Sequence, residues 1–199
     1  FSKYILAIFS VLLVGLGNPG SNYTNTRHNI GFKIIDAINA HFKLSKQKPK
    51  FKGLLTTGNI DEKKIYAIKP LTFMNNSGTA IKELIDYFKI DAKDVIVFHD
   101  DMDIDFGKVK AKFGGTSAGH NGIESIDKFI GKEYSRVRVG IGHPKQKKKV
   151  NNHVLEDFKD DEEEKINEIT ENIVKLIPTL IDKKIDLFSS KINQNLNGI

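Results

Sequence analysis

Hydrophobic and polar residues alternate along the chain in blocks that predict strands and helices in turn. The apolar run 5–14 stops in a loop rich in glycine and asparagine, which is typical of a buried strand. Apolar residues at helical spacing predict an amphipathic helix over 30–42. Two further runs, 51–60 and 64–70, flank the polar turn 61–63 and predict an antiparallel hairpin.

The rest of the chain continues this alternation, and Ser77 is the predicted N-cap of its first helix. From about Asp160 the spacing predicts a long amphipathic helical region, which Pro178 should kink or break. The other predicted elements are a surface linker over 43–50, a loop over 71–78, a helix around 81–88, a buried strand over 95–98, an exposed edge strand over 108–113, a glycine-rich loop over 114–122 followed by a helix, and a strand over 136–142.

Strands that alternate with helices predict an α/β fold, namely a mixed twisted sheet with helices on both faces. The length of 199 residues fits a single domain over 1–199. The run 5–14 also fits the apolar part of a signal peptide, but no small-residue cleavage site follows it and it is too short to span a bilayer. We therefore expect a cytoplasmic protein in which a few disordered residues lead into a buried strand.

Composition narrows the classes of function. The absence of cysteine excludes disulfides, thiolate metal sites and a cysteine nucleophile. A net charge of +6 favours a polyanionic partner without identifying one. The three arginines, Arg27, Arg136 and Arg138, lie beside strand ends and loops that contain glycine or histidine.

The loop after the first strand, Gly15-Leu-Gly17-Asn-Pro-Gly20, matches the dinucleotide-binding pattern G-x-G-x-x-G. That pattern needs a helix to begin inside the glycines, so that its N-terminus holds a pyrophosphate. Here Pro19 and Gly20 lead instead into the polar run 21–26, whose residues favour caps and turns. The loop is therefore expected to display side chains rather than to hold a cofactor.

Polar residues follow several predicted strands at the edge where α/β sheets form their sites. Asn18 follows the first strand, Asn75 the strand 64–70, and Asp100 ends the strand that begins at Val95. Asn121 lies in the glycine-rich loop that can fold over the same edge. One asparagine beside glycine or proline is usually a turn residue, but three at one edge favour recognition of amides and of a developing oxyanion.

His28 is the candidate base at this edge. An imidazole near its free pKa deprotonates water at neutral pH, and a carboxylate such as Asp100 holds the required tautomer. Because the chain has neither cysteine nor a G-x-S-x-G elbow, the expected nucleophile is water. Asp101, Asp103 and Asp105 match the start of a calcium loop, but Phe106 stands at its required glycine, so we expect a solvated turn and no metal.

Basic residues alternate on two predicted strands, as Lys110 and Lys112 on one and Arg136 and Arg138 on the other. Such groups at the rim of a sheet can bind phosphate, and arginine can do so with two hydrogen bonds. A solvated sheet face explains the pattern equally well. The remaining histidines, His41, His120, His143 and His153, show no spacing typical of metal ligands.

Five segments resemble the bacterial peptidyl-tRNA hydrolase family, in order, from about Leu12 to Phe158. They are VGLGNPGSNYTNTRHNIGF, KPLTFMNNSG, FHDDMDI, KFGG…GHNGI and RVRVGIGHP. The resemblance implies hydrolysis of the ester between a peptide and the ribose of its tRNA, which recycles tRNA from aborted translation. It also implies no metal or other cofactor, no membrane partner and a monomer, with the helical region around 160–190 as a lid.

The family's functional residues are carried over by matching positions. The resemblance makes His28 the catalytic base and Asp100 the residue that stabilises its active form, and Asn18 distinguishes blocked peptidyl-tRNA from free aminoacyl-tRNA. The matched positions for the peptide and the CCA 3′ end are Tyr23, Phe73, Asn75 and Asn121, and those for the 5′ phosphate of the acceptor stem are Lys112 and Arg138.

The chain departs from the family pattern at three places. Thr116-Ser117-Ala118 replaces a stretch that is often richer in glycine, Glu124 replaces a basic residue, and Glu156 replaces a glycine. The first two lie near the expected tRNA path, so they bear on affinity rather than on chemistry. Two other functions stay open on the sequence: a non-catalytic RNA-binding relative, and a nucleotide-cofactor enzyme built on GLGNPG.

Overall fold

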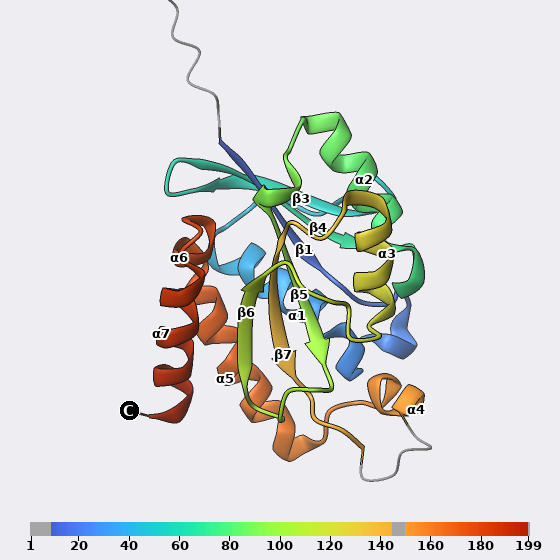
Figure 1. Ribbon diagram of the computed structural model, residues 1–199, viewed down its shortest axis with the longest axis vertical. Helices are drawn as coiled ribbons and strands as arrows, with labels where there is room; N and C mark the ends of the chain where they lie inside the picture. The colour runs from blue at the N-terminus through green and yellow to red at the C-terminus, as the bar shows by residue number, and fades with distance from the viewer. Residues whose placement is uncertain (1–8, 145–149, 199) are drawn as a thin grey trace, which may run out of the picture.

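The computed structural model describes residues 9–144 and 150–198, which form a seven-stranded mixed sheet with helices on both faces (Figure 1). This confirms the predicted fold class. The strand order is β2-β3-β4-β1-β5-β7-β6; β4, β1, β5 and β7 run parallel, and the other three pair antiparallel. The strands are β1 Ser10–Gly15, β2 Lys48–Lys50, β3 Gly53–Ile60, β4 Lys63–Pro70, β5 Val95–Asp101, β6 Val109–Phe113 and β7 Ser135–Gly140.

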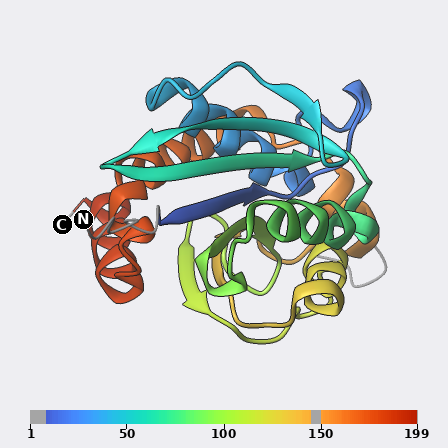
Figure 2. The same ribbon diagram turned by 90° about the horizontal axis from the view of Figure 1, so that it is seen from above.

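The helices lie in two layers (Figures 1 and 2). On one face α1 packs against β1 and β5, with α5 beside it and α7 over β6; on the other face α2 packs against α3. The helices are α1 Ile30–His41, α2 Ser77–Phe88, α3 Asn121–Ile130, α4 Val150–Leu155, α5 Asp160–Lys175, α6 Ile177–Ile181 and α7 Ile185–Asn197.

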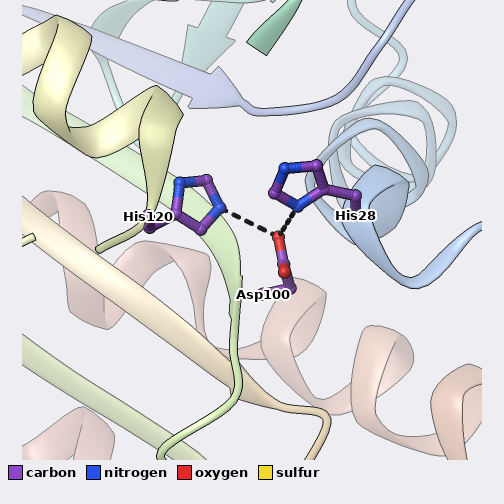
Figure 3. A group of neighbouring side chains, drawn as sticks. All are labelled: His28, Asp100 and His120. Carbon is purple, nitrogen blue, oxygen red and sulfur yellow. Dashed lines mark hydrogen bonds and ion pairs between the residues drawn. The ribbon is translucent and has the colours of Figure 1, made fainter. Parts of the chain in front are cut away.

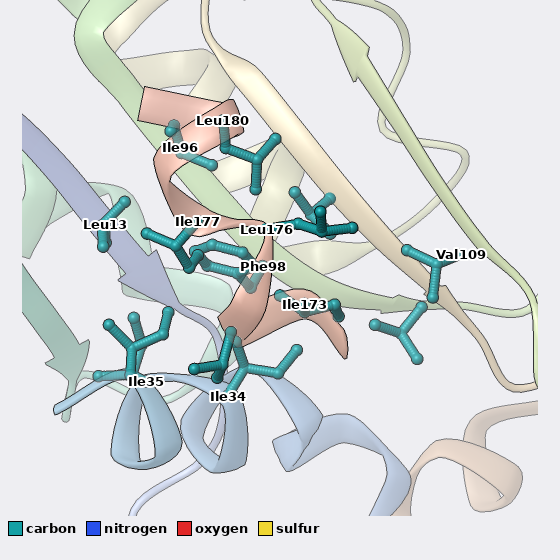
Figure 4. Packing of buried hydrophobic residues seen from close by; sticks show 14 of the residues in the cluster. Leu13, Ile34, Ile35, Ile96, Phe98, Val109, Ile173, Leu176, Ile177 and Leu180 are labelled. Carbon is teal, nitrogen blue, oxygen red and sulfur yellow. The ribbon is translucent and has the colours of Figure 1, made fainter. Parts of the chain in front are cut away.

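The first strand shows why both faces are covered. Val11 and Leu13 belong to the core under α1 and α5, while Leu12 and Val14 belong to the core under α2 and α3. Successive side chains of a strand point to opposite faces, so a strand buried on both sides is apolar throughout. Figure 4 shows the first of these cores, where side chains of the sheet meet α1 and the C-terminal helices.

Several local predictions need correction. The predicted linker 43–50 contains the short edge strand β2, which pairs with β3. Ser77 is the first residue of α2 rather than its cap, because a 3₁₀ turn at Met74–Asn76 precedes the helix and the Ser77 hydroxyl donates to the Met74 carbonyl. The predicted disorder before the first strand and the charged loop at 145–149 lie outside the described residues.

The C-terminal helices complete the core on the α1 side of the sheet. Pro178 lies in the first turn of α6, so the predicted break occurs between α5 and α6. Apolar residues of all three helices, such as Ile169, Ile177 and Phe188, are buried against the sheet. The segment that borders the candidate site is α4, which precedes the region predicted as a lid. Among the described residues, no helix is both long and apolar enough to cross a membrane.

Arg27 attaches this C-terminal part to the segment that carries His28. Its guanidinium donates to the carbonyl oxygens of Glu156 and Asp157, at 3.2 and 2.8 Å, and to the Glu162 carboxylate at 2.8 Å. The Arg27 side chain is only 3% exposed, so it lies in the protein interior.

Replacing Arg27 with methionine is therefore expected to lower the free energy of unfolding by roughly 3 kcal/mol, because it removes three partly buried hydrogen bonds made by a charged donor. The matched control is Lys33→Met, which breaks a 2.9 Å pair with Glu163 whose side chains are about a third exposed. That change should cost at most about 1 kcal/mol. Urea unfolding measures both values, and equal losses would contradict the structural role of Arg27.

Candidate active site

The end of β1 and the start of α1 lie in direct backbone contact, and this contact positions His28. A Cβ atom on Gly15 would lie 2.2 Å from the Gly31 carbonyl oxygen, and one on Gly31 would lie 2.3 Å from the Leu16 nitrogen. Two glycines are therefore required where strand and helix meet. The helix begins only at Ile30, after the 3₁₀ turn Arg27–Asn29, so the expectation that no helix starts inside GLGNPG is confirmed.

The structure brings His28 and Asp100 together. The His28 Nδ1 atom lies 2.8 Å from Asp100 Oδ1, and both residues are buried (Figure 3). A carboxylate oxygen accepts, so Nδ1 carries the proton and Nε2 keeps its lone pair. Figure 3 shows that this second nitrogen points away from Asp100. His28 also lines the two cavities beside it, so the arrangement suits a general base.

His120 is a third member of the group, and the sequence interpretation missed it. Its Nε2 lies 2.9 Å from the same Asp100 oxygen, while its Nδ1 accepts hydrogen bonds from the backbone of Gly122 and Ile123. These bonds assign the neutral tautomer with the proton on Nε2, and they cap α3. The sequence interpretation set His120 aside because its spacing is not typical of metal ligands, but its partner here is a carboxylate. The signal in the sequence was that His120 directly precedes the candidate site residue Asn121.

Charge sets the protonation states of the group. Burial lowers the pKa of His28, but the charge and hydrogen bond of Asp100 outweigh it and raise the pKa above the ordinary value. Burial raises the pKa of the Asp100 carboxyl, yet His28 and His120 hold it well below its usual range. His99 is fully buried, and its pKa lies far below normal because burial disfavours its charge. Asp100 is thus a permanent carboxylate beside an imidazole of increased basicity.

His28, Asp100 and His120 also offer three ligand atoms within 4.8 Å of one another. A zinc ion holds nitrogen and oxygen ligands at about 2.0–2.2 Å in a tetrahedral arrangement, so its ligand atoms lie more than about 3.2 Å apart. The observed distances of 2.8 and 2.9 Å are those of hydrogen bonds. A metal would therefore have to spread the three side chains and replace both shared protons.

Asn18 is held by three hydrogen bonds, two to the Asn29 side chain and one to the backbone of Met74. The Asn29 side chain accepts from the Asn18 backbone nitrogen and donates to its carbonyl oxygen, both at 2.9 Å. The Asn18 side-chain oxygen accepts from the Met74 backbone nitrogen at 2.8 Å. The Asn18 amide nitrogen has no hydrogen-bond partner among the described residues, and the side chain lines a cavity. This fixed residue therefore presents a donor.

Two adjoining cavities meet at His28. The inner cavity, of about 80 Å³, lies beside Asp100 and the glycine-rich loop, and the outer cavity, of about 460 Å³, lies beside Asn18 and Asn75. Asn121 lines both, and so do Asn151 and Val154 of α4, which the sequence interpretation did not select. The candidate asparagines of the sequence thus surround one imidazole.

The two aromatic candidates differ in position. Phe73 lines the outer cavity with its side chain 52% exposed, and its φ of 58° is rare for a bulky residue. Such strained backbone is common at ligand sites. Tyr23 lies in the 3₁₀ turn Ser21–Tyr23 and lines neither cavity.

The basic candidates form a pair at the open edge of the sheet. Lys112 on β6 lies opposite Arg136 on β7, and Arg138 lies one step further along the same face of β7, opposite Lys110. Burial, together with the charges of Arg138 and Arg136, lowers the pKa of Lys112. Arg138 Nε donates to Asp101 Oδ2 at 2.8 Å, so the predicted solvated turn is wrong at Asp101, which is buried. Arg136, predicted to face the rim, is also buried, and it bonds to Asp127. Arg136 is held by α3 and the glycine-rich loop, and Asp101 is held by Arg138 of β7.

Two departures from the family pattern contact each other. The Ser117 hydroxyl donates to the Glu124 carboxylate at 3.3 Å, which joins the glycine-rich loop to the first turn of α3. A carboxylate in this turn also suits the helix dipole. The third departure, Glu156, supplies a carbonyl oxygen to Arg27.

Comparison with known proteins gives a consistent result. The family model described as peptidyl-tRNA hydrolase matches residues 12–198. The chain is 70% identical to a peptidyl-tRNA hydrolase of Pelagibacter ubique over 92% of its length and 98% of that protein. It is 44% identical to the Ehrlichia canis protein of the same name over 93% and 95% of the two chains. The crystal structure of peptidyl-tRNA hydrolase from Acinetobacter baumannii superposes with a TM-score of 0.87 at 33% identity, covering 92% and 94%.

Proposed function

The chain belongs to the peptidyl-tRNA hydrolase family, and from that premise we propose that it hydrolyses the ester between a peptide and its tRNA with water activated by His28. The observation that carries this mechanism is the 2.8 Å contact between His28 and Asp100, with the free imidazole nitrogen at a cavity ringed by asparagines. The tRNA released by the reaction returns to translation, so we propose that the protein acts in the cytoplasm. We also propose that it acts as a monomer.

In the proposed reaction the His28 imidazole first accepts a proton and later returns it. His28 Nε2 takes a proton from water as the oxygen attacks the ester carbonyl, and Asp100 stabilises the imidazolium that forms. Asn75 and Asn121 line the cavity, and we assign their amide groups as donors to the developing oxyanion. When the carbon–oxygen bond to the ribose breaks, the imidazolium returns its proton to the ribose oxygen. The carboxylic acid of the peptide then ionises.

Asn18 supports discrimination between substrates. Its oxygen is occupied by the Met74 backbone nitrogen, so its amide N–H faces the ligand. A donor suits the carbonyl oxygen of a peptide bond and opposes the ammonium of a free aminoacyl-tRNA. Phe73 and Asn75 line the same cavity, and we assign them to the CCA end and the peptide beside it. Tyr23 stays a weaker candidate for this role.

Lys112 and Arg138 are proposed to bind the 5′ phosphate of the acceptor stem. The Asp101 carboxylate occupies the Nε side of Arg138, which leaves its terminal nitrogens for an anion. Burial and then the charge of Arg138 lower the pKa of Lys112, so a phosphate bound by both cations would relieve the repulsion between them.

The double change Lys112→Ala and Arg138→Ala should weaken tRNA binding about tenfold or more and reduce the slope of log affinity against log salt by about 1 to 2. Filter binding across a salt series measures both. The control Lys175→Ala with Lys191→Ala makes the same change in net charge at exposed positions of α5 and α7. If short peptidyl-nucleotide substrates lose as much activity as tRNA substrates, the two residues are not a distal phosphate clamp.

The function is tested by release of deacylated tRNA from N-acetylaminoacyl-tRNA and from free aminoacyl-tRNA. We expect rapid release from the first, little from the second, and the same rates with a chelator. A non-catalytic RNA-binding relative would bind both and release neither. Rates that a chelator abolishes would point instead to a metal at the His28, Asp100 and His120 group.

A further inference from the structure

A second groove adjoins the outer cavity at Asn18. Its cavity volume is about 530 Å³, within the range of about 300–1,000 Å³ that is usual for ligand sites. It lies between the loop after β1, the start of α1 and the adjoining strands β3 and β4. We call it the Leu71 groove, after one of its main lining residues, Asn18, Phe32, Asp36, Leu54, Lys69 and Leu71.

The groove and the outer cavity are adjacent. Asn18 lines both, and the loop that carries Leu71 on the groove carries Phe73 on the outer cavity two residues later. The Phe32 ring lies directly on Gly17, where an added Cβ would come within 2.7 Å of it. An apolar surface therefore begins next to Asn18, on the side away from His28.

The two lysines that line the Leu71 groove are both paired with carboxylates. Lys69 Nζ lies 2.6 Å from Asp36 Oδ1 and 5.7 Å from the centre of the Phe32 ring, with its side chain only 11% exposed. Lys33, on the same rim, is paired with Glu163 at 2.9 Å. These cations are already neutralised, so the surface offered to a ligand is mainly that of Phe32 and Leu71.

We propose that the Leu71 groove binds the peptide residues that precede the ester-linked residue, and that it favours uncharged, apolar side chains there. The proposal rests on the function proposed above, since the peptide is the part of that substrate that continues past Asn18. An apolar side chain gains by leaving water against Phe32, Leu54 and Leu71, whereas a carboxylate loses hydration and finds both lysines of the lining already paired.

The test compares three substrates: N-acetyl-leucyl-tRNA, which ends near Asn18, and two tetrapeptidyl-tRNAs with leucine or glutamate at the residues before the ester-linked one. We expect the wild-type kcat/KM to be about fivefold or more higher for the leucine tetrapeptide than for the glutamate one. Leu71→Ser should remove most of this preference and leave the short substrate unchanged. Leu71→Lys should reverse it, a gain for the glutamate peptide that misfolding cannot produce.

The matched control is Leu187→Ser on α7, because Leu187 is 42% exposed and Leu71 is 37% exposed. It should change none of the three values. Equal hydrolysis of all substrates by wild type and both Leu71 variants would overturn the groove and leave the hydrolase intact. Failure of wild type to hydrolyse even the short substrate would instead remove the proposed function, and the groove proposal with it.

Discussion

Replacing His28 with alanine is expected to lower kcat on peptidyl-tRNA by about 10²–10⁴-fold, the usual contribution of a positioned general base. The imidazole is the group whose free nitrogen faces both cavities, and Asp100 holds its other nitrogen at 2.8 Å. In the alanine variant, the attacking water has no comparable group to accept its proton. The asparagines and the basic pair do not touch His28 Nε2, so affinity for the tRNA should stay within about twofold of wild type.

Single-turnover release of tRNA measures the first quantity, and binding of deacylated tRNA measures the second. The control is His41→Ala, because His41 is an exposed histidine in the last turn of α1, the helix that follows His28. It should leave both quantities unchanged. A His28→Ala enzyme with near wild-type kcat would exclude this imidazole as the base, whereas a parallel loss of binding would show that the residue only maintains the site.

Most of the fold was predictable from the periodicity of apolar residues, and the reason is physical. Leu12 and Val14 face one core while Val11 and Leu13 face the other, so a doubly buried strand left an unbroken apolar run. The C-terminal helices also showed their apolar spacing. The surface against which these helices pack depends on tertiary contacts, and their apolar residues complete the core beside α1.

Candidate site residues were predictable where a polar residue follows or ends a predicted strand, as at Asn18 and Asp100. They were not predictable where contacts between distant segments decide which side chains meet. His120 joins the group because the start of α3 turns its ring toward Asp100. Asp101 is paired because Arg138, which lies opposite His99 on β7, donates to its carboxylate. Arg136 shows the converse, since its alternation with Arg138 suggested exposure but a neighbouring loop covers it.

Asp100→Asn is expected to lower kcat by roughly 10³-fold and to move the acid limb of the pH–rate profile to lower pH. Asp100 fixes the proton on His28 Nδ1, and an amide can present either a donor or an acceptor there. The shift has a definite sign. The carboxylate raises the pKa of His28 while burial lowers it, so removing the charge leaves burial to act alone. The imidazole then stays neutral to lower pH.

The same pair makes a prediction for stability. The raised pKa of His28 stabilises the fold below the ordinary histidine value of about 6.5, and this contribution is lost as the pH rises through the raised value. The lowered pKa of Asp100 stabilises the fold above about 3.9 and is lost at much lower pH. Asp100→Asn should therefore reduce the free energy of unfolding most between about pH 4 and 6.5.

These two measurements separate catalysis from structure. Asp105→Asn is the control, because the Asp105 side chain is 82% exposed in the turn after β5. It should change neither the pH–rate profile nor stability. An Asp100→Asn enzyme that is less stable but keeps the wild-type acid limb would make Asp100 a structural acceptor for His28 and His120 only. A displaced limb requires instead that the carboxylate sets the basicity of the imidazole during turnover, which is the electrostatic relation on which the proposed water activation depends.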